Sequence, residues 1–333
     1  MRAQAKAFSS PAFLQKGEGR GERVFRGVLL AAFLLLAACA PRVEGLGPET
    51  GAPRLADGAI VAADGYRLPL RRWGPEERPR AVILGLHGFN DYSGFLENAA
   101  EIWAERGILT VAYDQRGFGE TEGRGLWHGA EALVSDARAA VRLVRARWPE
   151  APLTLMGESM GGAVAIAALS PGYPGGGAAP SVDGLVLSAP AAADWERFSW
   201  WRRALFWTAA HTVPWMEATG RGLKLKPSDN IEMLRALGRD PLVIKRTRLD
   251  AVWGLIRLGD AAYDAADRLP GPALVLWGAK EALIPPESRD ALNARLPEAG
   301  VERRLYPAGH HMLTRDLAGE IVVGDIAAWA AAR

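Results

Sequence analysis

Short apolar runs alternate along most of this chain with longer segments in which apolar residues recur every three or four positions. The short runs, together with the segment 301–306, predict strands at residues 81–86, 108–113, 153–156, 184–188, 273–277 and 301–306. The longer segments predict helices at residues 95–106, 130–148 and 321–332. Strands that alternate with helices predict an α/β fold, with a mostly parallel sheet and helices on both of its faces.

A turn signal near the start of this pattern predicts how the sheet begins. Asp64-Gly65 is typical of a tight hairpin turn, and it separates residues 59–62 from residues 66–73. We expect these two segments to form an antiparallel pair of strands that opens the sheet.

The stretch LTLMGESMGG at residues 153–162 predicts a strand, a tight turn and a helix in direct succession. Its centre, GESMG at residues 157–161, matches the pattern G-x-S-x-G, in which a strained turn lifts the serine hydroxyl above the edge of a sheet. Glycines suit the positions two residues either side of the serine, because strand and helix pass close together there. We predict that Ser159 is a nucleophile. The alternative is a glycine-rich loop that contains a serine by chance.

The amino terminus has the pattern of an export signal. Residues 1–26 are polar and basic, and residues 28–38 form an apolar run that suits a signal-peptide core and is too short to cross a bilayer. The sequence LAAC, which ends at Cys39, resembles the bacterial lipobox, in which the cysteine is lipidated.

These features predict a lipoprotein-type signal peptide over residues 1–39, lipidation of Cys39 and an exported bacterial lipoprotein. Such a protein would be anchored to a membrane surface that faces the periplasm or the exterior. An ordinary secretory signal and an uncleaved anchor are the alternatives. Residues 40–56, which are rich in glycine and proline, are expected to form a tether.

Composition limits the chemistry that the chain can carry. The 333 residues have a net charge of +2 and are 49% apolar, an ordinary globular mixture that gives no reason to expect a nucleic-acid partner. The one cysteine excludes an intramolecular disulfide and a cysteine-based metal site. No zinc pattern and no phosphate-cradling glycine loop occurs, so we predict neither a metal nor a cofactor.

Six short motifs occur in the order that one hydrolase family shows. They are HGFNDYSG (87–94), DQRGFGET (114–121), GESMGG (157–162), LSAP (187–190), GAKEALIPP (278–286) and YPAGHHML (306–313). With these motifs the chain resembles an α/β-hydrolase of the monoacylglycerol lipase and lysophospholipase group, which is similar to the S33 serine aminopeptidases. The resemblance implies a hydrolase core at residues 57–190 and 270–333, and a helical cap or lid at residues 191–269.

A serine hydroxyl is a poor nucleophile alone and needs a base, which in this fold is a histidine after the last strand. His310 and His311 occupy that position, and the resemblance assigns the base to His311 and leaves His310 as a rim residue. The family usually has an aspartate three residues after the glycine that ends the second-to-last strand. In this chain that glycine is Gly278, and the residue three positions later is Glu281. The resemblance therefore implies Glu281 as the acid that orients His311, with Asp194 as the alternative.

The fold also implies which groups would bind an oxyanion. The backbone N–H groups of Met160, directly after the nucleophile, and of Phe89, in the loop that begins at His87, are expected to form the oxyanion hole. The resemblance gives His87 the role of fixing the shape of that loop. The alternative for Phe89 and Met160 is that they are apolar wall residues.

The implied cap contains six of the twelve tryptophans, between residues 195 and 253, with Arg197, Arg202 and Arg203 among them. Aromatic and basic residues suit a membrane interface, although tryptophans also pack a cap onto a core. A hydrophobic cap over a serine nucleophile favours an acyl-chain substrate. The predicted function is therefore hydrolysis of carboxylic esters of single-chain lipids, monoacylglycerols or lysophospholipids, through an acyl-enzyme. A serine aminopeptidase, a transacylase and a non-catalytic surface lipoprotein are the alternatives.

Overall fold

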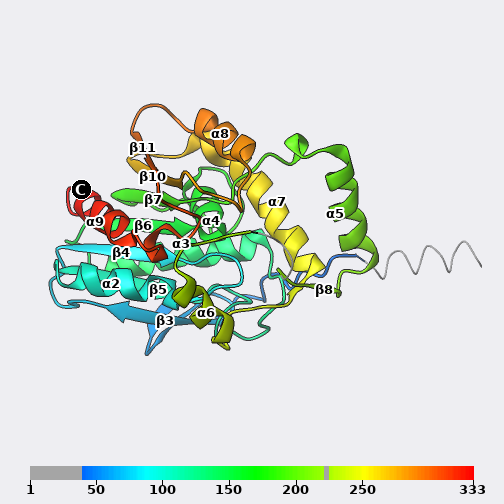
Figure 1. Ribbon diagram of the computed structural model, residues 1–333. Coiled ribbons are helices and arrows are strands. Elements are labelled where there is room, and N and C mark those ends of the chain that lie inside the picture. The colour runs from blue at the N-terminus through cyan, green and yellow to red at the C-terminus, as the bar shows by residue number, and fades with distance from the viewer. Residues whose placement is uncertain (1–39, 221–224) are drawn as a thin grey trace, which may run out of the picture.

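A nine-stranded sheet forms the centre of the molecule in a computed structural model that describes residues 40–220 and 225–333 (Figure 1). The strands lie in the order β1-β2-β3-β5-β4-β6-β7-β10-β11. They are β1 (Arg54–Ala56), β2 (Ala59–Val61), β3 (Arg67–Trp73), β4 (Ala81–Leu86), β5 (Ile108–Tyr113), β6 (Leu153–Glu158), β7 (Gly184–Ser188), β10 (Ala273–Gly278) and β11 (Val301–Tyr306). The six strands from β5 to β11 in this order run parallel, whereas β1, β2 and β3 are antiparallel to their neighbours. The predicted α/β class with a mostly parallel sheet is confirmed.

The opening hairpin lies where its turn signal predicted it. β2 and β3 pair across a turn in which the Asp64 carboxylate accepts the backbone N–H of Tyr66 (3.1 Å) and Gly65 has a φ of 84°. The sheet begins earlier than expected, however, because β1 lies inside the stretch 40–56 that we expected to be a tether. β1 is three residues long at the sheet edge, and its side chains are exposed or half-buried, so it has no apolar alternation that the sequence could reveal.

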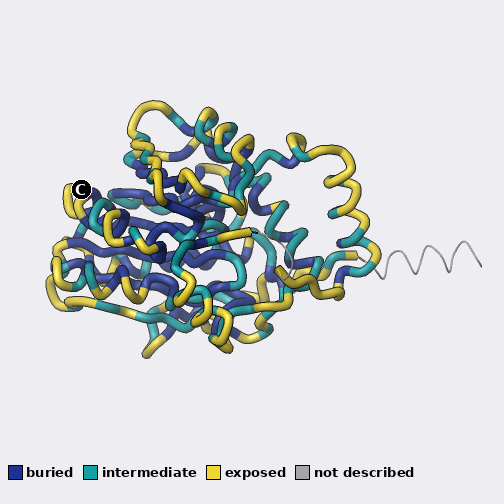
Figure 2. Tube along the Cα trace, viewed as in Figure 1, coloured by how far each residue is buried: buried dark blue, intermediate teal, exposed yellow. Residues whose placement is uncertain are grey.

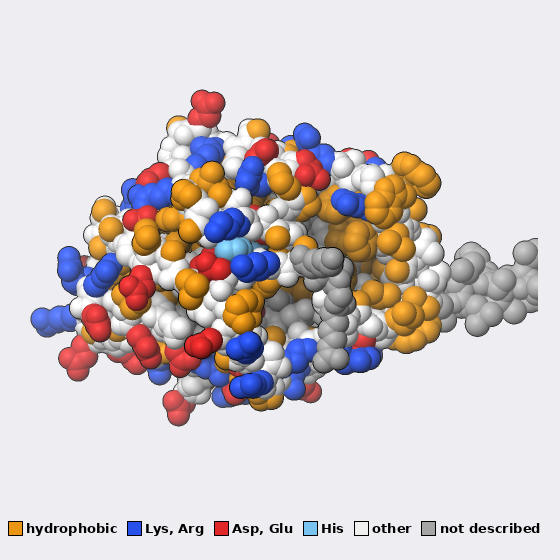
Figure 3. Space-filling view, in the orientation of Figure 1, with side chains coloured by type: hydrophobic (Ala, Val, Ile, Leu, Met, Phe, Trp, Pro, Cys, Tyr) orange, Lys and Arg blue, Asp and Glu red, His pale blue; other side chains and the backbone are white. Residues whose placement is uncertain are grey.

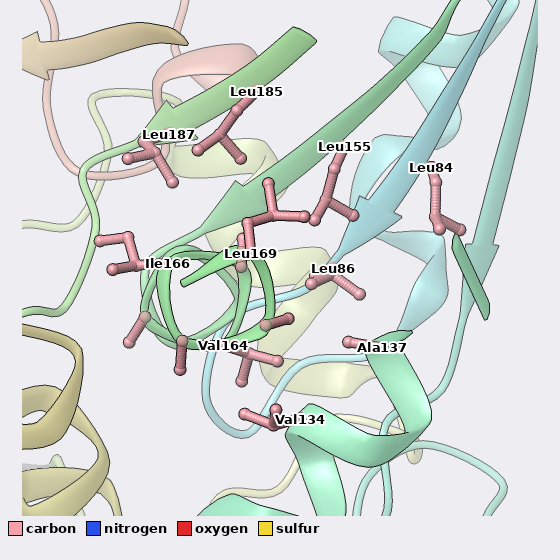
Figure 4. Packing of buried hydrophobic residues seen from close by; sticks show 14 of the residues in the cluster. Leu84, Leu86, Val134, Ala137, Leu155, Val164, Ile166, Leu169, Leu185 and Leu187 are labelled. Atoms are coloured by element: carbon pink, nitrogen blue, oxygen red, sulfur yellow. The ribbon is translucent and has the colours of Figure 1, made fainter. Parts of the chain in front are cut away.

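The parallel strands send alternate side chains into two hydrophobic cores, one on each face of the sheet. In β4, Val82, Leu84 and Leu86 belong to the larger core, and Ala81 and Ile83 belong to the other. The larger core is covered by α3 (Ala130–Arg147), α4 (Met160–Leu169), α7 (Leu249–Ala265) and α8 (Pro286–Arg295), and the other by α2 (Glu97–Ala104) and α9 (Gly319–Ala330). Figure 4 shows the larger core, where α3 and α4 pack against the strands. Burial on both faces explains why inner strands such as β4, β5, β7 and β10 are continuous apolar runs, whereas the edge strand β11 is not.

The insertion between β7 and β10 forms a cap. It contains α5 (Trp200–Thr212), α6 (Ile231–Arg239) and α7, the short strands β8 (Glu217–Ala218) and β9 (Thr247–Arg248), and the 3₁₀ turns η2 (Trp195–Arg197) and η3 (Ala266–Arg268). Leu258 and Ala262 of α7 are buried in the larger core, so this helix joins the cap to the sheet. Ala210 is the one buried residue of α5, which lies at the outer side of the cap (Figures 1 and 2). In its described part, the insertion expected at residues 191–269 therefore consists of helices, one short strand pair and connecting loops.

Within the described residues, no helix is both long enough and apolar enough to span a bilayer. The predicted signal peptide and Cys39 fall in residues 1–39, outside the described part of the chain.

Candidate active site

A sharp turn between β6 and α4 carries Ser159. The strand ends at Glu158, the helix begins at Met160, and Ser159 between them has a φ of 53° and a ψ of −115°. A positive φ is uncommon outside glycine and strains the backbone. The Ser159 N–H donates to the Ser188 carbonyl (2.9 Å), and the Ser159 carbonyl accepts the Ala191 N–H (2.9 Å). These bonds hold the strand, turn and helix that the sequence predicted around Ser159.

Two glycines permit this turn. A Cβ atom on Gly161 would lie 2.1 Å from the carbonyl oxygen of Leu86, and one on Gly157 would lie 2.3 Å from the carbonyl oxygen of Gly161. Both distances are far inside van der Waals contact, and the obstacles are backbone atoms that cannot swing away. The geometry therefore excludes a side chain at either position.

The predicted acid and base are in direct contact. His311 Nδ1 lies 2.7 Å from Glu281 Oε2, and both side chains are almost completely buried. Glu281 Oε1 accepts the backbone N–H groups of Leu283 (2.6 Å) and Ile284 (3.1 Å). A carboxylate held in this way accepts the Nδ1–H of the imidazole and leaves Nε2 as the basic nitrogen.

The surroundings of Glu281 keep its carboxyl group ionised. Burial raises the pKa of Glu281, but the hydrogen bond and charge of His311, together with the two backbone N–H groups, hold this pKa below its ordinary value. The alternative acid is engaged elsewhere: Asp194 accepts the backbone N–H of Glu196 (2.9 Å) and pairs with Arg197 (3.3 Å) at the start of η2. The structure therefore brings Glu281, and not Asp194, to His311.

Three buried charges join the histidine loop to the serine strand. Arg315, in the 3₁₀ turn η4 (Leu313–Arg315), donates to Asp91 with Nη1 (2.7 Å) and to Glu158 with Nη2. These three side chains are at most 8% exposed. Burial raises the pKa of Glu158, and the charges of Arg315 and His311 act in the opposite direction. Because Glu158 directly precedes Ser159, this ion trio draws together the loops that follow β4, β6 and β11.

Ser159 and His311 lie at the same end of the sheet, where the parallel strands have their carboxyl ends. Ser159 follows β6 and His311 follows β11, and both strands run parallel in one sheet. Glu158 directly precedes Ser159 in sequence. The charge of His311 acts to lower the pKa of Glu158, so His311 lies near this turn. In the described parts of the chain no hydrogen bond joins the Ser159 hydroxyl to His311. Catalytic hydrogen bonds of this kind often tighten only when substrate binds.

Sequence reasoning missed the ion trio. The one available signal was Glu158, an acidic residue inside an otherwise apolar motif, since a carboxylate buried there requires a charged or hydrogen-bonding partner. Nothing in the local pattern identified Asp91 or Arg315 as that partner.

Two backbone N–H groups around Ser159 donate no hydrogen bond to any described residue. They belong to Met160, the first residue of α4, and to Phe89, in the loop after β4. This loop lies close to the serine, because a Cβ atom on Gly88 would be 3.4 Å from the Ser159 Cβ. N–H groups at a helix N-terminus and in an adjoining loop can bind a developing oxyanion. The Phe89 ring also packs against Phe118 (5.6 Å between centroids), and the Met160 side chain is fully buried, so both contribute apolar packing too.

His87 fixes the shape of this loop. Its Nδ1 donates to the Gly88 carbonyl (2.8 Å), and its Nε2 accepts the backbone N–H of Gln115 (2.9 Å). The Gln115 side chain donates back to the His87 carbonyl (2.8 Å). Burial lowers the pKa of His87, which favours the neutral ring that this pair of bonds requires. The structural role that the resemblance implied for His87 agrees with these contacts.

His310 does not lie at the rim of the site, so that expectation is wrong. Only 3% of this residue is exposed, and its backbone N–H donates to Asp316 Oδ2 (2.7 Å). The physical reason is that the loop after β11 folds tightly onto the end of β10: a Cβ atom on Gly278 would lie 2.4 Å from the His310 carbonyl oxygen. This close approach buries His310 together with His311.

The tryptophans of the cap divide into two groups. Trp195 and Trp253 pack edge to face inside the cap, with 5.2 Å between ring centroids. Trp200, Leu205 and Trp207 of α5 are instead 81%, 57% and 53% exposed. Figure 3 shows hydrophobic side chains gathered over α5 and along the hollow beside it. Packing explains the first group and leaves the second without a partner in the described structure.

Comparison with known proteins places this geometry in a family context. A family model described as serine aminopeptidase, S33, matches residues 77–318. The chain is 27% identical over 286 residues to a monoacylglycerol lipase of Mycolicibacterium smegmatis, covering 81% of this chain and 95% of that protein. It is 28% identical over 289 residues to the monoglyceride lipase of Homo sapiens, covering 81% of this chain and 90% of that protein.

Solved structures share the α/β-hydrolase fold. A monoacylglycerol lipase from Paleococcus ferrophilus gives a TM-score of 0.62 at 23% identity and covers 80% of this chain and 98% of that one. A soluble variant of the monoglyceride lipase from Saccharomyces cerevisiae gives a TM-score of 0.66 at 19% identity, with 87% of this chain and 97% of that one covered.

Proposed function

Because the chain belongs to the serine aminopeptidase S33 family of α/β-hydrolases, we propose that it cleaves carboxylic esters of single-chain lipids, monoacylglycerols or lysophospholipids. The observation that carries this proposal is the 2.7 Å contact between His311 and Glu281, at the sheet edge that also carries the strained turn at Ser159. Relatives named as monoacylglycerol and monoglyceride lipases favour an ester over a peptide substrate.

In the proposed reaction, His311 Nε2 takes the proton of the Ser159 hydroxyl as the serine oxygen attacks the ester carbonyl carbon. Glu281 accepts the Nδ1–H of His311 and stabilises the imidazolium that forms. The former carbonyl oxygen becomes negative and is bound by the N–H groups of Met160 and Phe89. The tetrahedral intermediate then expels the alcohol, which receives the proton from His311. His311 then deprotonates a water molecule, which attacks the acyl-serine; as the fatty acid is released, the Ser159 oxygen leaves and regains the proton from His311.

The exposed face of α5 supports a lipid substrate that is taken from a surface. Tryptophan and arginine together favour the interface between membrane and water, and Arg202 lies over the ring of Trp201 at 5.2 Å. A lipid anchor on Cys39 would keep the enzyme beside its substrate. The proposal therefore includes export as a bacterial lipoprotein, held at a membrane surface that faces the periplasm or the exterior.

Hydrolysis of three substrates by the purified protein tests the proposal: a monoacylglycerol, a lysophospholipid and a prolyl amide, with the acyl product identified by chromatography. We expect fatty acid from one or both esters and no cleavage of the amide. Ser159→Ala should lower ester turnover by about 10⁴-fold or more. The matched control is Ser188→Ala on the neighbouring strand, which removes a buried hydroxyl that has no hydrogen-bond partner in the described part of the chain and should leave turnover unchanged.

Each alternative has its own outcome in this assay. Preferred cleavage of the prolyl amide would replace the proposal by an aminopeptidase. Transfer of the acyl group to an added alcohol, in place of water, would replace it by a transacylase. Near-normal turnover by Ser159→Ala would exclude this site as the source of activity, and no turnover of any substrate by the wild type would favour a non-catalytic lipoprotein.

A further inference from the structure

A group of three potential metal ligands lies next to the histidine loop, outside the site described above. Asp229 belongs to the cap, in the segment before α6, whereas His310 and Asp316 belong to the loop that follows β11. One potential ligand atom from each residue lies within 4.8 Å of the other two. His310 and Asp316 are buried and Asp229 is half-buried, so two of the three ligands are shielded from solvent and the third is partly accessible.

His310 Nδ1 is the atom that points to a ligand. The side chain is 4% exposed, and Nδ1 has no hydrogen-bond partner among the described residues. It faces Asp316 Oδ2 at 3.7 Å, which is too long for a hydrogen bond. Two ligands that share one tetrahedral Zn²⁺ ion lie about 3.4 Å apart, as metal–ligand bonds of 2.0–2.2 Å require. The observed separation is therefore closer to that of two ligands of one metal than to that of a donor and its acceptor.

Both carboxylates are already held in position by neighbouring groups. Asp316 Oδ1 accepts the Ser228 hydroxyl (2.6 Å), and Asp229 Oδ1 accepts the backbone N–H of Leu317 (2.9 Å). Outer hydrogen bonds of this kind orient the ligands of metal sites. Among the described residues no lysine or arginine pairs with either carboxylate, since Arg315 is committed to the ion trio. Two carboxylates thus meet beside an imidazole without a balancing cation from the residues that the structure describes.

From this arrangement we infer that Asp229, His310 and Asp316 bind a divalent transition-metal ion of the Zn²⁺ class. The imidazole nitrogen favours Zn²⁺ over Ca²⁺ and Mg²⁺, which prefer oxygen ligands. Three protein ligands leave a fourth position for water, beside the partly accessible Asp229. The ion would tie the cap segment to the loop that carries His311. Its role is structural, and the inference does not depend on the proposed lipid substrate.

No zinc pattern occurs in the sequence because the three ligands are far apart along the chain. Asp229 comes from an insertion that separates two strands, and the other ligands follow the last strand. Only the fold brings them together.

Calorimetric titration of the untagged full chain, stripped of metal by a chelator, tests the inference. We expect one equivalent of Zn²⁺ to bind in the titration and no binding of Ca²⁺. In a separate thermal scan, Zn²⁺ should raise the melting temperature and Ca²⁺ should not. His310→Gln and Asp229→Asn should each weaken Zn²⁺ binding by about 100-fold or more. The Asn side chain retains an oxygen for the Leu317 N–H, so the second variant is expected to fold even where the first does not.

Two further measurements separate this site from other histidines. His128→Gln replaces another buried histidine whose Nε2 has no described partner, and it should leave Zn²⁺ binding unchanged. Co²⁺ should give visible d–d absorption bands with the wild type and not with Asp229→Asn. Absence of Zn²⁺ binding by the wild type would overturn the inference. Wild-type affinity in a folded His310→Gln or Asp229→Asn variant would overturn it as well, because the metal would then bind elsewhere, for example at His311.

Discussion

Replacing Arg315 by methionine would keep much of the side-chain volume and remove the positive charge that Asp91 and Glu158 share. Arg315 donates to Asp91 at 2.7 Å and contacts Glu158 directly, and the three side chains are 7%, 8% and 2% exposed. The variant would leave two carboxylates buried without their common partner. Since Asp91 lies on the loop after β4 and Glu158 ends β6, the contact of these two segments with the histidine loop would be weakened.

The expected cost follows from the burial of the trio. Removing one partner of a buried ion pair costs about 3–5 kcal/mol, because the remaining charge is left uncompensated. Arg315 has two such partners, so we expect Arg315→Met to lose at least about 3 kcal/mol in the free energy of unfolding. Adding Glu158→Gln removes one of the two stranded charges. The double variant should therefore be more stable than Arg315→Met alone.

The loss should depend on pH in a defined direction. Burial raises the pKa of Glu158 above its ordinary value, and Arg315 opposes that rise. Without Arg315 the pKa of Glu158 rises further, so the folded state binds a proton more readily than the unfolded state. A folded state that binds more protons loses stability as the pH increases. The difference between wild type and Arg315→Met should thus be larger at pH 8 than at pH 5.

Urea unfolding followed by tryptophan fluorescence at both pH values measures these quantities. The stabilising role of the ion trio would be refuted by a loss below about 1 kcal/mol at both pH values, which is typical of an exposed ion pair. It would also be refuted by a double variant that is no more stable than Arg315→Met. Either result would mean that the trio does not hold the loops together.

Glu281→Gln should lower the kcat of ester hydrolysis by about 10³–10⁴-fold, because an amide no longer enforces the required tautomer of His311, whereas Asp194→Asn should have little effect; the reverse order would reassign the acid. Gly161→Ala should destabilise the fold by about 1–3 kcal/mol, since its Cβ would lie 2.1 Å from the Leu86 carbonyl oxygen, and an unchanged melting temperature would contradict this. The pKa of Glu281 is held below its ordinary value of 4.5, so its contribution to stability is present above pH 4.5 and is lost as the pH falls through the lower folded value. Calorimetry from pH 6 to pH 3 should show a steeper fall in melting temperature for wild type than for Glu281→Gln, and parallel curves would argue against the pairing.

The inner parallel strands could be predicted from the sequence because burial on both faces makes them continuous apolar runs, as in β4 and β10, whereas the edge strand β11 has no buried residue and no such run. The sheet edge and surface could not be predicted in the same way. β1 has no buried residue, and α8 buries only Ser288 and Leu292, so neither carries a periodic apolar pattern. The apolar periodicity by which a helix or strand is predicted becomes weaker as fewer of its side chains are buried.

In the site, too, features formed by consecutive residues could be predicted, whereas contacts between residues far apart in sequence could not. The turn at Ser159 was predictable because its strand, glycines and helix are consecutive in sequence. The contact between Glu281 and His311 could be predicted only through a family resemblance, since it depends on the register of β10 and β11. The burial of His310 and the partners of Glu158 were missed, because they arise only when loops from separate strands pack against one another.

Labelling with a fluorophosphonate probe, followed by peptide mapping with mass spectrometry, tests most directly whether Ser159 is an activated nucleophile. The expected result is one covalent adduct on Ser159 in the wild type and in Ser188→Ala, and no adduct in Ser159→Ala. An unlabelled wild-type protein, or an adduct that persists on another serine in Ser159→Ala, would contradict it.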